Sequence, residues 1–146
     1  MEDPVVVLAA DDAQKRDALA VREAVFIREQ GVPPELELDE HDQTALHFVA
    51  YAGGRAIGAA RLRPYNKDTG KVERVAVLSA WRGKGVGRLL MAAVEQEAAA
   101  RGFVRLRLNA QTHAEPFYRK LGYETVSEVF EEAGIPHVTM VKTLAP

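Results

Sequence analysis

The chain has 146 residues, of which 47% are hydrophobic and 27% are charged, and its formal net charge is -2. This length and composition are typical of one globular domain with its own core. The slight negative charge excludes a global positive field for nucleic acid, and the lack of cysteine excludes disulfides, a thiolate zinc site and a cysteine nucleophile.

The first third of the chain is expected to contain a strand and a helix. Residues 5–9 are a short apolar run that predicts a strand. Asp11 or Asp12 can cap a helix that continues to about Glu29. The glycine and the two prolines within residues 31–34 then stop that helix.

Three strands and two turns are expected in the middle of the chain. Residues 46–51 and 56–62 predict two strands of a hairpin, because Gly53-Gly54 can supply the positive φ values of a tight turn. A second turn over residues 66–70 leads into a strand at 71–77. On strict alternation the side chains of Glu73, Val75 and Val77 face one way, and those of Val72, Arg74 and Ala76 face the other.

A glycine-rich loop follows this strand and opens a helix. Residues 82–88 read Arg-Gly-Lys-Gly-Val-Gly-Arg, so unshielded N–H groups and the positive helix end converge on a volume suited to phosphate. A Walker loop needs Ser or Thr where Gly85 stands, and the dinucleotide fingerprint needs glycine where Arg88 stands. Both nucleotide loops are therefore disfavoured. On the pattern alone, an ordinary glycine-rich turn explains the loop equally well.

The last part of the chain returns to the sheet. The helix that begins near Gly85 ends near Gly102, and residues 104–108 alternate apolar and basic side chains as a half-buried strand does. Strand, helix and strand in this order predict a right-handed crossover between parallel strands. A short helix at 114–121 and final strands at about 124–130 and 137–144 complete the expected elements.

Two motifs and the element order resemble one known family. The pattern Arg82-x-x-Gly85-x-Gly87 resembles the pyrophosphate signature of the GNAT acyltransferases, and residues 117–123 are similar to their second recurring motif, Phe-Tyr-x-x-x-Gly-(Phe/Tyr). Segments 25–33, 108–111 and 134–137 also resemble the branch of YjcF-like and ElaA-like proteins. The resemblance implies an α+β (mixed α/β) GNAT fold in a single domain over residues 1–146. Its central sheet would be mixed and mostly antiparallel, with a splayed parallel strand pair and flanking helices.

The resemblance also implies acetyl-CoA as the acyl donor. No metal is predicted, because the four histidines lack a metal-binding spacing such as His-Glu-x-x-His. The pyrophosphate would lie on the loop amides, and the pantetheine arm would lie beside the preceding strand. That strand and its parallel neighbour would diverge in a V, so that their backbone groups are free to bond to the cofactor. Asn109 is a further candidate contact, with a strand-ending turn residue as the alternative. The implied cofactor-binding residues are Val75, Ala76, Val77, Arg82, Gly83, Lys84, Gly85, Val86, Gly87, Arg88 and Asn109.

The implied reaction transfers an acetyl group to a primary amine. Tyr118 stands where the family has the acid that protonates the leaving thiolate, and the alternative is an aromatic ring that only packs. A backbone N–H near Val75 would stabilise the oxyanion. Glu73 is the candidate base, against the alternative of a surface carboxylate paired with Lys71 or Arg105. A water chain is equally admissible, because the family often has its base where Lys71 stands.

Direct transfer in a ternary complex is favoured, because the chain has no cysteine and no serine in a Gly-x-Ser-x-Gly motif. The acceptor is expected to be a small-molecule or peptide amine, and the acidic segment 35–42 either attracts it or is a solvated loop. A noncatalytic acyl-CoA-binding module is the alternative function. We expect no nucleic-acid partner, no membrane partner and a cytoplasmic location, and a homodimer stays open.

Overall fold

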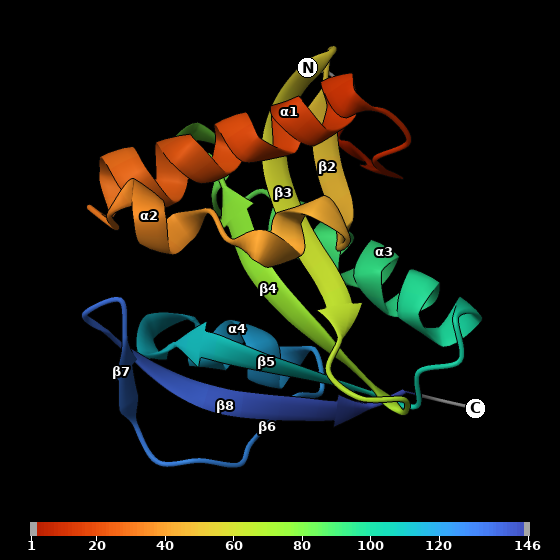
Figure 1. Cartoon of the computed structure of the whole chain (residues 1–146), viewed down its shortest axis with the longest axis vertical. Coiled ribbons are helices and arrows are strands. Elements are labelled where there is room, and N and C mark those ends of the chain that lie inside the picture. The colour runs from red at the N-terminus through yellow and green to blue at the C-terminus, as the bar shows by residue number, and fades with distance from the viewer. Residues whose placement is uncertain (1–2, 145–146) are drawn as a thin grey trace.

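A computed structural model describes residues 3–144 of the chain (Figure 1). Its helices and turns are α1 (Asp12–Arg22), its π-helical continuation η1 (Glu23–Glu29), α2 (Pro34–Glu37), η2 (Glu40–Gln43), η3 (Ser79–Trp81), α3 (Val86–Ala100), η4 (Thr112–Ala114) and α4 (Glu115–Lys120). Its strands are β1 (Val5–Leu8), β2 (Leu46–Ala52), β3 (Arg55–Pro64), β4 (Thr69–Val77), β5 (Arg105–Gln111), β6 (Glu124–Thr125), β7 (Phe130–Glu132) and β8 (Ile135–Thr143).

The described strands form one sheet in the order β1-β2-β3-β4-β5-β8-β6, and β7 also pairs with β8. All of these neighbours are antiparallel except β4 and β5, which are parallel and are connected through α3. The expected mixed, mostly antiparallel sheet with flanking helices is therefore confirmed. The expected crossover after the glycine-rich loop is confirmed with it.

Helices cover the two faces of the sheet unequally. In Figure 1, α1 lies across β2, β3 and β4, α2 lies beside the C-terminal end of α1, and α3 lies on the opposite face. The core under α1 includes Val21, Val49 and Ala76, and the larger core on the other face includes Leu90 and Leu108. The face of β5 and β8 that continues the α1 side of the sheet is not covered by α1 or α2 (Figure 1). The space beside β4 on this face of the sheet is therefore open to solvent and to a ligand.

Local sequence signals account for the ends of several elements. The carboxylate of Asp11 accepts a hydrogen bond from the Gln14 backbone N–H at 2.8 Å, which caps α1 as expected. Gly53 and Gly54 have φ values of 56° and 80°, so the hairpin between β2 and β3 has the expected positive-φ turn. The helix predicted to run to Glu29 does so, but its last part, η1, is π-helical.

The parallel pair separates along its length. Paired residues run from Thr69 with Arg105 to Val72 with Leu108, and no pairing of β4 with β5 continues beyond this point within residues 3–144. The carboxyl end of β4 therefore leaves β5 in the expected V, visible in Figure 1. The edge of β4 that faces β5 keeps backbone groups available to a ligand.

A β-bulge in β4 overturns the expected strict alternation of its side chains. Arg61 of β3 pairs with Glu73 whereas Ala59 pairs with Ala76, so β4 contains one extra residue at this point. Arg74 has a φ of 57°, which marks the bulged position. Val75 therefore packs with the α3 core and Glu73 faces the α1 side. The prediction that Glu73 shares a face with Val75 and Val77 is wrong.

The strand predicted at 124–130 is also wrong, because it is interrupted. β6 and β7 both pair with β8, but residues 126–129 between them leave the regular ladder. The Ser127 hydroxyl accepts a hydrogen bond from the Thr139 N–H at 2.8 Å, in place of a backbone carbonyl. The Val126 N–H still donates to the Thr139 carbonyl at 2.8 Å, so the segment stays beside β8. A side-chain acceptor thus replaces part of the ladder.

Candidate active site

A cleft of about 1410 Å³ opens where β4 and β5 separate. It is lined by η1, α2, β4, the loop before α3, β5, α4 and the β7–β8 hairpin. Pockets for drug-sized ligands are typically about 300–1,000 Å³. The cleft therefore has room for a long ligand together with a second, smaller one.

The glycine-rich loop presents free backbone N–H groups at one end of this cleft. Gly83 and Gly85 have φ values of 74° and 85°, a conformation that glycine adopts without strain. The first hydrogen bond of α3 runs from Leu89 to Gly85, and the N–H groups of residues 83–88 donate to no backbone carbonyl in the described chain. These donors lie at the positive end of the α3 dipole. The arrangement fits an anionic phosphate group.

The arginine that begins the loop is held by other parts of the protein. Arg82 donates from Nε to the Val77 carbonyl at 3.1 Å, and its guanidinium forms an ion pair with Glu29 of η1. This hydrogen bond to Arg82 lowers the pKa of Glu29. Arg82 thus ties the end of β4 to η1 rather than standing free for a phosphate. Lys84 lies over the Trp81 ring at 5.5 Å, and Arg88 is exposed at the cleft.

The two sequence motifs meet at Gly87. A Cβ atom at this position would lie 3.1 Å from Cζ of Phe117, closer than ordinary van der Waals contact allows. Phe117 belongs to α4 and Gly87 to the first turn of α3. Glycine at 87 therefore lets α4 approach the loop, which brings the neighbouring Tyr118 to the same cleft.

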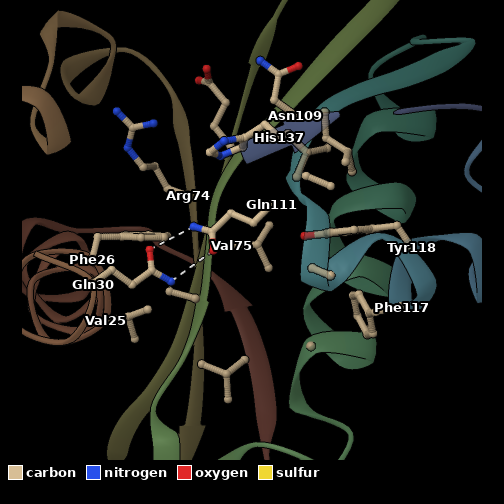
Figure 2. Close-up of a pocket in the computed structure, with 18 of the residues that line it drawn as sticks. Val25, Phe26, Gln30, Arg74, Val75, Asn109, Gln111, Phe117, Tyr118 and His137 are labelled. Carbon is tan, nitrogen blue, oxygen red and sulfur yellow. Dashed lines mark hydrogen bonds between the residues drawn. The ribbon is translucent and has the colours of Figure 1, made fainter. Parts of the chain in front are cut away.

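Tyr118 is buried to 7% exposure, and its ring contacts those of Phe117 and Tyr123 edge to face, at centroid distances of 4.9 Å and 5.8 Å. Figure 2 shows its hydroxyl pointing into the space between β4 and β5. Within residues 3–144 this hydroxyl has no hydrogen-bond partner, whereas that of Tyr123 donates to Glu95 at 2.9 Å. Burial raises the pKa of Tyr118, so it stays protonated at neutral pH.

Glu73 lies among cations. Its carboxylate accepts from Arg61 and from Arg63, each at 2.7 Å, and lies 3.3 Å from Lys71 Nζ. Burial alone would raise the pKa of Glu73, but these hydrogen bonds and charges outweigh burial and lower the pKa to about 2. The ion pair with Lys71, which belongs to the alternative interpretation of Glu73, is therefore present, whereas Arg105 instead approaches Thr69. A carboxylate with this pKa is a weak base at neutral pH.

Three carboxylates of the acidic segment after η1 are paired with arginines, whereas Glu35 and Glu40 are exposed. Glu37 is 3% exposed and forms ion pairs with Arg22 and Arg74, both at 2.8 Å. Asp39 and Asp42 likewise accept from Arg61, at 2.7 Å and 2.8 Å. Because arginines pair with these three carboxylates, the solvated-loop alternative is wrong for Glu37, Asp39 and Asp42. The expectation that the segment attracts an amine stays a prediction. Reasoning from sequence missed Arg22, although its place on the apolar face of α1 was a signal.

Arg74 connects the bulge in β4 to this acidic segment. Its guanidinium donates to the Glu37 carboxylate at 2.8 Å, to the Glu37 carbonyl at 3.1 Å and to Asp39 at 3.3 Å. The side chain therefore fixes the bulge from outside the sheet. The next residue is Val75, whose N–H is the candidate oxyanion donor. Nothing in the sequence signalled this bulge, because glycine is the usual residue at positive φ.

Polar side chains bridge the two halves of the cleft. The amides of Gln30 and Gln111 exchange hydrogen bonds of 2.9 Å and 3.3 Å. Figure 2 shows this pair between the end of the cleft near Arg74 and the end near Phe117. It thereby joins η1 to β5 at the level where the strands separate. Sequence reasoning missed this contact, because the two glutamines are 81 residues apart.

Asn109 lines the cleft but is engaged by neighbouring strands. Its Nδ2 donates to Glu132 at 3.2 Å, and its Oδ1 accepts from the Thr139 hydroxyl at 2.9 Å. His137 lies 3.6 Å from Glu132, at the same end of the cleft. In the described part of the chain, no cluster of three or more His, Cys, Asp or Glu side chains could hold a metal. No helix between residues 3 and 144 is long and apolar enough to cross a membrane.

Comparison with known proteins gives matches over nearly the whole chain. The family model described as an acetyltransferase (GNAT) domain matches residues 9–144. YjcF of Bacillus subtilis (strain 168), described as an uncharacterized N-acetyltransferase, is 47% identical over 137 residues, 93% of this chain and 97% of YjcF. The crystal structure of Escherichia coli ElaA matches with a TM-score of 0.83 at 29% identity, over 97% of this chain and 99% of ElaA. A structure of an aminoglycoside 6'-N-acetyltransferase shares the fold, with a TM-score of 0.75 at 18% identity over 97% and 98% of the chains.

Proposed function

The chain belongs to the GNAT acetyltransferase family, and from this premise we propose that it transfers an acetyl group from acetyl-CoA to a primary amine. The family confirms the resemblance found in the sequence, including the branch of YjcF and ElaA. The observation that carries the proposal is the set of free N–H groups at residues 83–88, which opens onto the unpaired edge of β4. We propose that residues 1–146 are a single acetyltransferase domain.

The pyrophosphate of the coenzyme binds at the loop amides, as it would at any exposed helix start with this geometry. The related aminoglycoside acetyltransferase structure was solved as a complex with coenzyme A, which supports the same ligand here. The pantetheine arm adds to the edge of β4 along Val75, Ala76 and Val77, whose backbone lacks a partner on the β5 side. Arg82 contributes by holding the Val77 carbonyl, and Asn109 faces the arm from β5.

The chemistry follows direct transfer. The amine nitrogen forms a bond to the thioester carbon, and the carbon–sulfur bond breaks as the tetrahedral intermediate collapses. The Val75 N–H stabilises the oxyanion, because the bulge turns this stretch of β4 out of the regular ladder. Tyr118 donates its proton to the leaving sulfur and regains one from solvent. Its free, protonated hydroxyl between the strands supports this role.

The amine must lose a proton before it attacks. We assign this proton transfer to a water chain that leads out of the cleft, in preference to Glu73. Three cations surround the Glu73 carboxylate, and its pKa of about 2 makes it a poor proton acceptor at neutral pH. Glu73 instead holds Arg63 and Lys71 at the wall of the cleft. The expectation that it is the base stays a prediction, which an active Glu73→Gln variant would exclude.

Release of free thiol from acetyl-CoA tests the proposal across a panel of amino acids, polyamines, aminoglycosides and peptide amines. We expect acetylation of at least one class, with loss of turnover in Tyr118→Phe. Tyr123→Phe is the matched control, because it removes a tyrosine hydroxyl that bonds Glu95 rather than one in the cleft. Coenzyme binding without turnover on any amine would favour the noncatalytic binding module. No nucleic-acid or membrane partner is part of this proposal, and a homodimer and a cytoplasmic location stay predictions.

A further inference from the structure

A row of cations crosses the sheet beside the proposed acyl site. Arg63 of β3 is paired in register with Lys71 of β4, which is paired in register with Arg107 of β5. Leu62, Val72 and Leu108, each adjacent to one of these cations in its own strand, belong to the core on the α3 face. The three cationic side chains therefore leave the sheet on the opposite face, where Arg63 and Lys71 line the cleft and Arg107 lies beside that lining.

Like charges placed directly opposite one another on a sheet destabilise it. Here a single carboxylate, that of Glu73, pairs with both Arg63 and Lys71, and it also accepts from buried Arg61. Arg107 forms no ion pair within residues 3–144 and lies over the ring of Tyr65 at 4.9 Å. The row therefore has more positive charge than its protein partners neutralise.

The wider ion network has the same imbalance. Its cations are Arg22, Arg61, Arg63, Lys71 and Arg74, and its carboxylates are those of Glu37, Asp39, Asp42 and Glu73. The fully buried arginines lie at its inner end, whereas the side chains of Arg63 and Lys71 are 22% and 19% exposed at the cleft. The unmatched charge is therefore at the outer, accessible end.

Other charged groups face the cleft at different places. Glu29 is paired with Arg82 beside the donor loop. Glu40 is largely exposed beside His41, and Glu132 bonds Asn109 on the β7–β8 side. Neither of these two carboxylates pairs with the cation row.

We infer that the amine acceptor carries an anionic group, a carboxylate or a phosphate, which binds to Arg63 and Lys71 with Arg107 beside them. The inference rests on the proposed acetyl transfer at Val75. Lys71 and Val75 are four residues apart on β4, which is about 13 Å of strand, and the bulge and the reach of the side chains shorten that span. An acceptor whose amine and anion are about 10 Å apart fits this spacing.

Matched acceptors test the anionic group directly. The panel contains 8-aminooctanoate and 8-aminooctyl phosphate as anionic amines, octylamine as their uncharged-tail partner, and 1,8-diaminooctane as the cationic counterpart. We expect kcat/KM for at least one anionic amine to exceed that of octylamine by about tenfold or more, as for a hydrogen bond to a charged group. The carboxylate and phosphate arms identify which anion the site prefers. Preference for octylamine or the diamine would overturn the inference.

Variants assign the preference to the row. Lys71→Gln and Arg63→Gln should each lower the ratio of kcat/KM for the preferred anionic amine to that for octylamine by about tenfold or more. Arg105→Gln is the matched control, because Arg105 is an exposed arginine two residues before Arg107 on the same face of β5 and is paired in register with Thr69 rather than with Lys71. It should leave the ratio unchanged. An unchanged ratio in the folded Lys71→Gln protein would contradict the inference.

Calorimetry separates this inference from the proposed function. Anionic amines are titrated into the protein saturated with coenzyme A, which cannot turn over. If the anionic amines bind and their binding weakens in Lys71→Gln, the anion site is supported. If acetyl-CoA nevertheless shows no turnover with these amines, only the proposed acetyl transfer is contradicted. If amines are acetylated but the anionic ones bind no more tightly than the others, the anion site is contradicted and the proposed acetyl transfer is still supported.

Discussion

Replacement of Arg74 by glycine and by alanine tests the bulge that presents the Val75 N–H. A φ of 57° is strained for any residue with a Cβ, by about 1 kcal/mol, and glycine avoids this cost. In an ordinary strand the order is reversed, since glycine is less stable than alanine by about 0.5–1 kcal/mol. The structure therefore predicts that Arg74→Gly is the more stable of the two variants.

The magnitude follows from the contacts of the side chain. Both variants lose the charge-assisted hydrogen bonds to Glu37 and Asp39, of which the buried one to Glu37 contributes about 1.5–3 kcal/mol. Glu37 keeps its ion pair with Arg22, so the loss stays below that of a wholly unpaired buried charge. We expect Arg74→Ala to lower the free energy of unfolding by about 2 kcal/mol and Arg74→Gly by about 1 kcal/mol less.

Urea unfolding measures this order, with Arg105→Gly and Arg105→Ala as controls at an ordinary, exposed strand position. In turnover, both Arg74 variants should lose kcat with little change in KM for acetyl-CoA, because Arg74 positions the bulge without touching the coenzyme. Arg74→Lys should recover part of kcat. If Arg74→Gly is less stable than Arg74→Ala, as in the control pair, the positive φ is absent in solution and the reasoning fails.

Three further predictions concern the same cleft. Tyr118→Phe should lower kcat by about 100- to 10,000-fold with little loss of stability. Tyr123→Phe should instead lower the free energy of unfolding by about 1 kcal/mol and change kcat little, because its hydroxyl bonds Glu95. Equal effects of the two variants on kcat would contradict the assignment of Tyr118 as the acid. Because its ion pairs lower the pKa of Glu73 from 4.5 to about 2, that carboxylate stabilises the fold fully above pH 4.5 and loses this effect as the pH falls toward 2. In Glu73→Gln, the free energy of unfolding should therefore fall by about 2 kcal/mol less on acidification than in the wild type, after allowance for solvent screening. An unaltered dependence of this free energy on pH would refute the lowered pKa of Glu73. Gly87→Ala should weaken binding of coenzyme A by displacing Phe117, measured by calorimetry, and Phe117→Leu in the same chain should restore it. Absence of rescue would show that the two side chains do not compete for space.

Signals that are local in sequence predicted much of the fold. Gly53-Gly54, the capping Asp11 and the glycines at 83 and 85 each specify a backbone conformation without reference to distant residues. The same holds for the crossover through α3, since strand, helix and strand follow one another along the chain. The loop end of the candidate site was therefore accessible from the sequence.

The other end of the site depends on contacts between distant segments. The bulge at Arg74 has no glycine to signal it, and it reverses the face of every later residue in β4. Burial of Arg61 and the pairing of the acidic segment arise only when residues 37–42 meet Arg61 of β3 and Arg74 of β4 in the folded chain. The interruption of the final hairpin similarly depends on one hydroxyl, that of Ser127. In each case, contacts between distant segments determine a local structure that differs from the one the regular sequence pattern predicts.

Calorimetric titration of coenzyme A into the folded protein tests the central claim most directly. The account predicts binding to one site per chain, much weaker binding of pantetheine, which lacks the pyrophosphate, and loss of affinity in Gly85→Val, where a branched side chain opposes a φ of 85°. Absence of binding by the folded wild-type protein, or equal affinity for pantetheine and coenzyme A, would contradict the claim that the free N–H groups of residues 83–88 bind the pyrophosphate.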